Sequence, residues 1–302
     1  MTDDAQLRRW YAEDLRLRAP VNRHLAIVEA FAAVPRERFL GPPPWRLLAD
    51  RLPHVAFAAP DSSPGWLYHD VLVVIDEART LNNGLPSLWA RTFDQLDLRP
   101  GRRVMLVGAG TGYYAAILAE VVGAEGRVVA VEVDAALAAR ARENLAPWRN
   151  VEVVAGDGRT HDPGEVDTII VCAGTTHPAP LWLERLAPGG QLLVPLTTND
   201  RWGFLLRATR IRERDARLIV LPQARDADRF EAVSVGPVGI YPCVGGRDEA
   251  AAKRLEAALT APERKSWFAE VPVAALHRGK PGTDKMAKAW YHAPGFWLER
   301  KA

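Results

Sequence analysis

The stretch Val104-Met-Leu-Val-Gly-Ala-Gly-Thr-Gly-Tyr113 decides the fold. Its first four residues form a short apolar run that is typical of a buried strand, and the helical apolar spacing of Tyr113–Val122 follows. Glycines between a strand and a helix allow a tight turn, and they let a ligand approach the free N–H groups at the helix start. The stretch therefore predicts a ligand-binding turn between the first strand and the first helix of an α/β sheet.

Strand-like and helix-like segments alternate after this turn. Strands are expected over residues 127–131, 151–154, 166–172 and 191–196, and helices over residues 135–145 and 180–186. Strands that alternate with helices of this length predict a doubly wound, mostly parallel sheet with helices on both faces. The predicted fold class is thus α/β and Rossmann-like.

The chain before this turn has a different pattern. Residues 1–60 have helical apolar spacing, and residues 61–90 are irregular apart from the β-branched run at 71–75. A helix over residues 87–96 then leads into the first strand.

Lysine usage separates the C-terminal part of the chain. All six lysines lie at or beyond Lys253, so arginine is the only long basic side chain before it. We therefore expect three parts: an N-terminal helical and substrate-side region (1–80), a core (81–245) and a C-terminal extension (246–302).

The extension begins with a helical pattern over 248–259 and ends in the aromatic stretch 289–298. Two interpretations of the aromatic residues remain open. They pack onto the main domain, or they form an exposed flank for a peptide or a dimer contact.

Composition excludes several classes of protein. The chain has 302 residues, is 48% hydrophobic and 25% charged, and carries a formal net charge of +2. This charge does not favour nucleic-acid binding, and no apolar run reaches the length of a membrane span. The N-terminus lacks the apolar core of a secretory signal. The two cysteines, Cys172 and Cys243, are interpreted as buried thiols. We expect a cytoplasmic enzyme.

The glycine spacing distinguishes between two cofactors. A dinucleotide fingerprint, G-x-G-x-x-G, needs glycine at position 113, where Tyr113 stands. The form found here, G-x-G-x-G, is usual in methyltransferases that use S-adenosylmethionine (SAM). The candidate cofactor-binding residues of this loop are Gly108, Gly110, Thr111, Gly112 and Tyr113.

Carboxylates follow the next two strands. Glu132 ends the second strand, where a carboxylate can accept hydrogen bonds from both ribose hydroxyls; Asp134 is the nearby alternative and is also a candidate helix cap. Asp157 and Gly158, in Gly156-Asp-Gly-Arg159, are placed to receive the adenine, although Gly-Asp-Gly is also good turn chemistry. With Leu186-Ala-Pro-Gly-Gly190, these features complete the pattern of a class I methyltransferase.

From about residue 20 to 245 the sequence resembles the protein-L-isoaspartate (D-aspartate) O-methyltransferases. Val34-Pro-Arg-Glu-Arg-Phe39 is similar to the family's V-P-R-x-x-F segment, and Tyr68-His-Asp70 with Ile75 resembles its Y-x-D…I-G stretch. The resemblance implies SAM as the methyl donor and S-adenosylhomocysteine as the product. It also implies a protein or peptide carboxyl group as the acceptor. From the charge and the apolar runs, we expect neither nucleic acid nor a membrane as a partner.

One segment departs from the family. The family carries T-x-S-x-P, whose hydroxyls help to hold the substrate carboxylate, and this chain reads Asn82-Asn-Gly-Leu-Pro86. Asn82 takes the threonine position and Gly84 the serine position, so we hypothesise that Asn82 or Asn83 replaces the serine; the alternative is that both are turn residues. The acceptor is then an isoaspartyl or aspartyl carboxyl group, or it belongs to a peptide natural product or small molecule. A SAM-binding module without repair activity is the other alternative.

Other chemistry has weaker support. His69 and His177 are candidates for the mouth of the active site, or they are exposed or structural histidines. No metal-ligand spacing is found, so no metal is expected, and the G-x-S-x-G turn of a serine hydrolase is missing.

Overall fold

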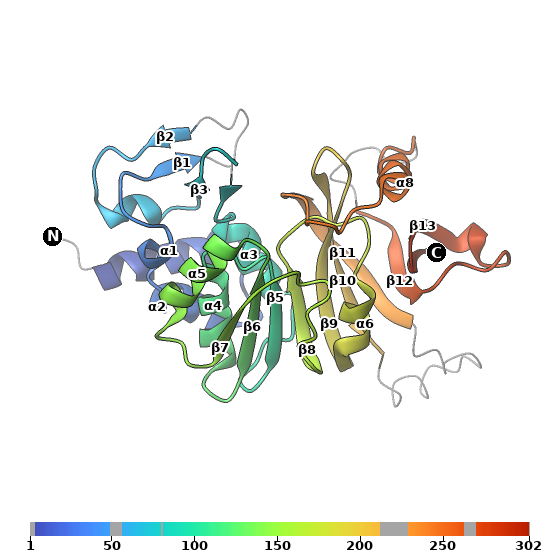
Figure 1. Ribbon diagram of the computed structural model, residues 1–302, viewed down its shortest axis with the longest axis horizontal. Helices are drawn as coiled ribbons and strands as arrows, with labels where there is room; N and C mark the ends of the chain where they lie inside the picture. The colour runs from blue at the N-terminus through green and yellow to red at the C-terminus, as the bar shows by residue number, and fades with distance from the viewer. Residues whose placement is uncertain (1–3, 49–55, 80, 212–228, 263–269, 302) are drawn as a thin grey trace. The chain divides into compact units, whose positions relative to one another are not determined.

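The structure is a computed structural model that describes residues 4–48, 56–79, 81–211, 229–262 and 270–301. These residues form two compact units (Figure 1). Unit 1 comprises residues 1–103 and 109–155, and unit 2 comprises residues 104–108 and 156–302. The sequence-based division into residues 1–80, 81–245 and 246–302 describes functional parts of the chain rather than compact units. It stays a prediction.

Unit 1 begins with two helices that pack on each other, α1 (Asp4–Arg18) and α2 (Leu25–Ala33). The carboxylate of Asp94 fixes the start of α2, because it accepts backbone N–H groups of residues 22–24 at 2.8 to 3.2 Å. Asp94 follows α3 (Pro86–Phe93). A short 3₁₀ helix, η1 (Arg36–Phe39), follows α2.

The glycine loop of unit 1 leads into a helix–strand series. Its elements are α4 (Tyr113–Val122), β6 (Arg127–Glu132), α5 (Ala135–Leu145) and β7 (Val151–Ala155) (Figure 1). Both helices have the predicted bounds, and β6 and β7 are parallel, as predicted. Every residue of α4 except Glu120 is buried, in keeping with a helix that is apolar on all sides.

A four-stranded antiparallel sheet in unit 1 corrects the prediction of helix over residues 1–60. Its order is β2-β1-β3-β4, and its strands are β1 (Arg46–Leu48), β2 (Ala56–Ala58), β3 (Leu72–Asp76) and β4 (Leu81–Asn82). The helix prediction is wrong at β1 and β2, because three residues are too few to show a period of two. Another 3₁₀ helix, η2 (Pro64–Leu67), precedes β3.

Unit 2 contains the parallel strands β5 (Arg103–Val107, from Val104 onward), β8 (Val166–Val171) and β9 (Leu186–Thr197). α6 (Pro180–Arg185) connects β8 to β9. Residues 169–171 of β8 are fully buried, as expected for a parallel strand that is covered on both faces.

Five further strands continue this sheet beyond β9, each antiparallel to its neighbour. In spatial order they are β10 (Trp202–Arg210), β11 (Arg229–Gly239), β12 (Val273–Arg278), β14 (Phe296–Arg300) and β13 (Ala289–Ala293) (Figure 1). None of these five strands was predicted from the sequence. A third 3₁₀ helix, η3 (Met286–Lys288), precedes β13.

The C-terminal region is built into unit 2. Helix α8 (Glu249–Leu259) starts one residue later than predicted, because Asp248 is its N-cap and accepts the N–H of Ala251 at 2.7 Å. The aromatic side chains of the β13–β14 hairpin are at most 7% exposed; they belong to Trp290, Tyr291, Phe296 and Trp297. This burial supports the packing interpretation of the aromatic tail over an exposed flank.

Candidate functional site

In unit 1, Glu132 holds the backbone of the glycine loop. One carboxylate oxygen accepts the N–H of Gly110 at 2.7 Å, and the other accepts the N–H of Asp134 at 3.0 Å. Burial raises the pKa of Glu132, and the backbone N–H groups that it accepts oppose this effect without cancelling it. A carboxylate has about four acceptor positions, so Glu132 retains capacity for a ligand hydroxyl.

The structure gives Asp134 a separate role. Its carboxylate accepts the N–H of Leu137 at 2.9 Å, which caps α5, and it pairs with Arg79. Asp134 is therefore occupied as a helix cap. Glu132 remains the predicted ribose-binding carboxylate.

The glycines of the loop are required for different reasons. Gly110 has φ +57°, and a Cβ atom there would meet nothing within 4 Å. Gly112 has φ +100°, and a Cβ atom there would lie 2.7 Å from Cδ1 of Leu145. Packing of Leu145, the last residue of α5, against the loop therefore requires Gly112, whereas open space at Gly110 is compatible with a ligand that approaches the backbone.

Thr111 and Tyr113 contribute to this loop through their backbone. The Tyr113 side chain is 2% exposed and packs in an aromatic cluster with Phe31 and Phe39. Thr111 is also buried, and its carbonyl accepts the side-chain amide of Asn144 at 2.9 Å. Their predicted cofactor contacts, which stay predictions, are thus limited to backbone groups.

In unit 2, the chain segments that follow β5 and β8 run side by side. The N–H of Cys172 donates to the carbonyl of Val107 at 2.8 Å, and a Cβ atom on Gly108 would lie 3.6 Å from the Cys172 Cβ. Gly108 has φ +81°. These residues lie at the carboxyl ends of parallel strands, where α/β sheets bind ligands.

Asp157 is held by its neighbour Arg159. One carboxylate oxygen accepts the Arg159 backbone N–H at 2.9 Å, and the other lies 2.7 Å from the guanidinium Nη2. Burial alone would raise the pKa of Asp157, but the bonds to Arg159 outweigh it and lower the pKa. Asp157 is therefore an ionised acceptor at neutral pH, and its adenine contact stays a prediction.

Packing explains the glycine at position 158. A Cβ atom there would lie 2.6 Å from Cγ1 of Val107, and the carbonyl accepts the Trp182 indole N–H at 2.8 Å. Gly158 is thus buried against the end of β5.

The acceptor-loop residues of unit 1 make mainly inward contacts. The Asn82 side-chain oxygen accepts the N–H of Gly84 at 2.9 Å, and the Asn83 oxygen accepts the N–H of Val73 at 3.2 Å. Gly84 has φ +78°, and a Cβ atom there would lie 2.7 Å from the indole nitrogen of Trp89. The loop therefore has no room for a serine side chain at position 84.

Arg36 anchors this region, a role that sequence reasoning missed. It is fully buried and donates to the carbonyls of Leu67, His69 and Val71, at 2.7, 3.1 and 2.7 Å. It also donates to the Asn83 side-chain oxygen at 3.2 Å. The only sequence signal was its place in the Val-Pro-Arg segment.

Comparison with known proteins gives the family. The sequence profile described as "Protein-L-isoaspartate(D-aspartate) O-methyltransferase (PCMT)" matches residues 14–219, more than half of the chain. The chain belongs to the protein-L-isoaspartate O-methyltransferase family. This membership confirms the family resemblance found in the sequence.

Individual relatives agree. The chain is 35% identical over 228 residues to a protein-L-isoaspartate O-methyltransferase of Methylorubrum extorquens, covering 74% of this chain and 82% of that protein. It is 38% identical over 179 residues to one from Aeropyrum pernix, covering 58% of this chain and 61% of that protein.

Solved structures support the fold. One, called protein-L-isoaspartate O-methyltransferase, has a TM-score of 0.61 at 18% identity and covers 96% of this chain and 88% of its own. A second, from Plasmodium falciparum in complex with S-adenosylhomocysteine, has a TM-score of 0.55 at 15% identity, covering 78% and 97%. These likenesses confirm the class I methyltransferase fold, and the protein-L-isoaspartate O-methyltransferase family is SAM-dependent.

The two candidate histidines differ in setting. His69, in unit 1, is exposed, and its carbonyl accepts Arg36. His177, in unit 2, is half-buried, and its Nδ1 lies 2.8 Å from the Thr176 hydroxyl. A hydrogen bond thus orients the side chain of His177, whereas the hydrogen bond of His69 involves only its backbone carbonyl.

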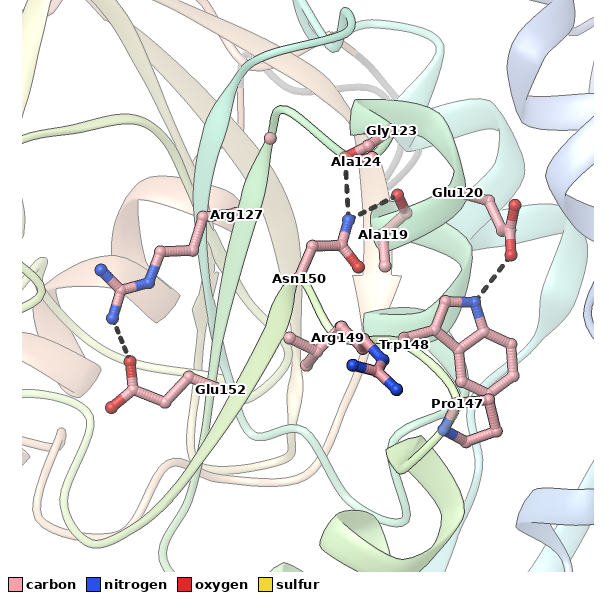
Figure 2. Close-up of a pocket in the computed structure, with 12 residues that line it drawn as sticks. Ala119, Glu120, Gly123, Ala124, Arg127, Pro147, Trp148, Arg149, Asn150 and Glu152 are labelled. Atoms are coloured by element: carbon pink, nitrogen blue, oxygen red, sulfur yellow. Dashed lines mark hydrogen bonds and ion pairs between the residues drawn. The ribbon is translucent and has the colours of Figure 1, made fainter.

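The pocket in Figure 2 lies elsewhere in unit 1. It has a volume of about 690 Å³ and is lined by the end of α4, by Arg127 at the start of β6, and by residues 147–152. The Asn150 amide already donates to two carbonyls of α4 and its C-cap (Figure 2). Because Glu132 stands at the opposite end of β6, this pocket is not the predicted cofactor site.

Within the described ranges, no helix is long and apolar enough to cross a membrane. The described residues also contain no group of three or more His, Cys, Asp or Glu side chains that could hold a metal ion.

Proposed function

We propose that this chain transfers a methyl group from SAM to a carboxyl group of a protein or peptide. The family match over residues 14–219 carries the proposal, because it spans every predicted donor-side residue. The alternative of a SAM-binding module without activity keeps the same donor side, including the buried Glu132 that accepts the Gly110 N–H. Methyl transfer, rather than SAM binding, therefore distinguishes the two.

The residues of the chain fit the methyl donor. The open space at Gly110 suits the methionine part, Glu132 suits the ribose hydroxyls, and the ionised Asp157 suits the adenine amino group. SAM, when bound, supplies an electrophilic methyl group and leaves as neutral S-adenosylhomocysteine. A carboxylate nucleophile is already ionised at neutral pH, so the protein contributes positioning and desolvation rather than proton transfer.

The nature of the acceptor carboxyl group is the finer part of the proposal. Gly84 has no space for the serine side chain that the family resemblance implies. This observation favours an acceptor that is held differently from an isoaspartyl residue, such as the aspartyl side chain of a peptide. A small-molecule carboxylate is the competing acceptor. The cytoplasmic location is a separate prediction from the sequence.

Labelled methyl transfer tests the proposal. Wild-type protein with labelled SAM should place base-labile label on an isoaspartyl peptide or on its aspartyl counterpart. Label on neither peptide, with SAM binding shown by calorimetry, would reject a peptide acceptor of this type.

A pair of variants tests whether the glycine loop binds SAM. Gly110→Asp should abolish SAM binding and transfer, because its side chain fills the space that the ligand needs. Gly101→Asp is the matched control: Gly101 also has positive φ (+82°) and open space, but it lies in the turn before β5. Equal affinity in the two variants would show that the loop is not the SAM site.

A further inference from the structure

The segment after β8 in unit 2, residues 173–177, is held by the C-terminal region. The Thr176 N–H donates to the Gly246 carbonyl at 3.1 Å, and the Thr176 carbonyl accepts the Tyr291 hydroxyl at 2.7 Å. The Asp248 N–H donates to the Thr176 hydroxyl oxygen at 3.0 Å. Thr176 is fully buried, so this position is fixed from three sides.

These contacts define the tautomer of His177. The Thr176 hydroxyl oxygen accepts the Asp248 N–H, and it lies 2.8 Å from Nδ1 of His177. A buried hydroxyl hydrogen needs an acceptor, and Nδ1 is the acceptor within reach. Nδ1 is then unprotonated, so a neutral His177 carries its proton on Nε2 as a donor.

Burial of the ring is the main reason that His177 is neutral near pH 7. Burial lowers its pKa, the negative charge of Asp248 opposes this, and the positive charge of Arg159 adds to it. The ring is half-buried, and Nε2 has no hydrogen-bond partner among the described residues. His177 therefore offers one oriented, uncharged N–H group.

The location suits a ligand of the reaction. The segment leaves the carboxyl end of β8, beside the end of β5 that leads to Gly108. Ligands of α/β sheets bind outside these strand ends. The family resemblance places the acceptor carboxylate beside the methyl donor, whose predicted contacts in unit 2 include Gly108 and Asp157.

We propose that Nε2–H of His177 donates a hydrogen bond to the acceptor carboxylate and so helps to position it. This inference rests on the proposed function. During transfer, one carboxylate oxygen forms the bond to the methyl carbon while the carbon–sulfur bond breaks and its electron pair stays on sulfur. The imidazole keeps its proton throughout. An uncharged donor positions the carboxylate while withdrawing less electron density from it than an imidazolium would.

Steady-state kinetics with His177 variants test this role, using the peptide that wild type methylates. His177→Ala should raise the peptide KM about tenfold, the expected effect of losing a hydrogen bond to a charged group, and leave the SAM Kd unchanged. His177→Gln retains an N–H donor and should stay within about threefold of wild type. His161→Ala, in unit 2 outside this segment, is the control and should match wild type.

Three outcomes overturn the inference. An unchanged peptide KM in His177→Ala, with wild type active, shows that the ring does not hold the acceptor. Equal losses in His177→Gln and His177→Ala, with melting temperatures like wild type, show that the donor is not what matters. If wild type methylates no carboxyl group on either peptide, the proposed function fails and this inference fails with it.

Discussion

The glycine loop of unit 1 and the segment after β8 of unit 2 are positioned by different parts of the sequence. The loop is fixed by residues close to it: Glu132 accepts the Gly110 N–H, and Leu145 packs against Gly112. The segment at 173–177 is fixed by residues 241–248 and Tyr291, which lie outside the family match. The glycine loop is thus held from within the family match, whereas the segment that carries His177 is held by the C-terminal region.

Glu132 provides the largest expected effect on the donor side. Glu132→Ala should weaken SAM binding at least about a hundredfold, because it removes the predicted ribose contacts and leaves two backbone N–H groups unpaired. Glu132→Gln keeps one acceptor oxygen and should lose roughly tenfold. Calorimetric titration with SAM measures the affinity of both variants. Wild-type affinity in Glu132→Ala would show that Glu132 does not bind SAM.

The same residue gives a pH signature. Burial raises the folded-state pKa of Glu132 above its unfolded value, so the folded state binds its proton more tightly. The stability that this adds is present at low pH and is lost as pH rises through the folded pKa. Urea unfolding from about pH 4 upward should therefore show wild type losing stability relative to Glu132→Gln. A constant difference between the two proteins would contradict this.

Stability distinguishes the two glycines of the loop. Gly112→Ala should destabilise folding by about 3 kcal/mol, since it combines a 2.7 Å contact with Leu145 and a φ of +100°. Gly110→Ala has only its φ of +57° against it, about 1 kcal/mol, but it should weaken SAM binding. Denaturant unfolding and SAM titration give the two readouts, and an equal loss of stability would make both glycines structural.

The secondary structure around the glycine loop was largely predictable from the sequence, for a physical reason. The strand, turn and helix signals of residues 104–132 are local, and the bounds of α4 and α5 agree with their apolar spacing. The sequence could not decide whether Asp134 caps helix α5 or binds a ligand in place of Glu132, because a helix-capping carboxylate and a ligand-binding carboxylate look alike in sequence. The structure shows that Asp134 is the cap.

The strands of unit 2 beyond β9 and the contacts of the C-terminal region were not predictable in the same way. β10 and β11 are defined by pairing with distant strands, and the contacts of Tyr291 with Thr176 join residues 115 positions apart. No local pattern encodes such contacts. Arg36 was missed because an arginine in a loop gives no sign that it will be buried among carbonyl groups.

Gly84→Ser tests whether the family's serine can be restored in unit 1. The added Cβ would lie 2.7 Å from the Trp89 indole nitrogen at a φ of +78°, so we expect a loss of about 2 kcal/mol in unfolding free energy and no gain of isoaspartyl methylation. Thermal unfolding and the methyl-transfer assay check this. A stable, more active variant would show that the loop alone sets the acceptor.

Asn82→Ala and Asn83→Ala address the alternative that these side chains replace the serine. Their oxygens accept the N–H groups of Gly84 and Val73. Unchanged turnover in both variants would leave Asn82 and Asn83 as turn residues.

Tyr291→Phe is the smallest and most specific test of the acceptor side. It removes a buried hydroxyl that donates to the Thr176 carbonyl at 2.7 Å and also lies 3.3 Å from the Ala251 carbonyl, and it keeps the aromatic ring. One buried hydrogen bond contributes about 1 kcal/mol, so global stability should fall only by that amount. If the C-terminal region positions residues 173–177, the peptide KM should rise severalfold while SAM affinity stays at the wild-type value. A variant that loses stability but keeps the wild-type peptide KM would show that Tyr291 supports the fold without positioning the acceptor.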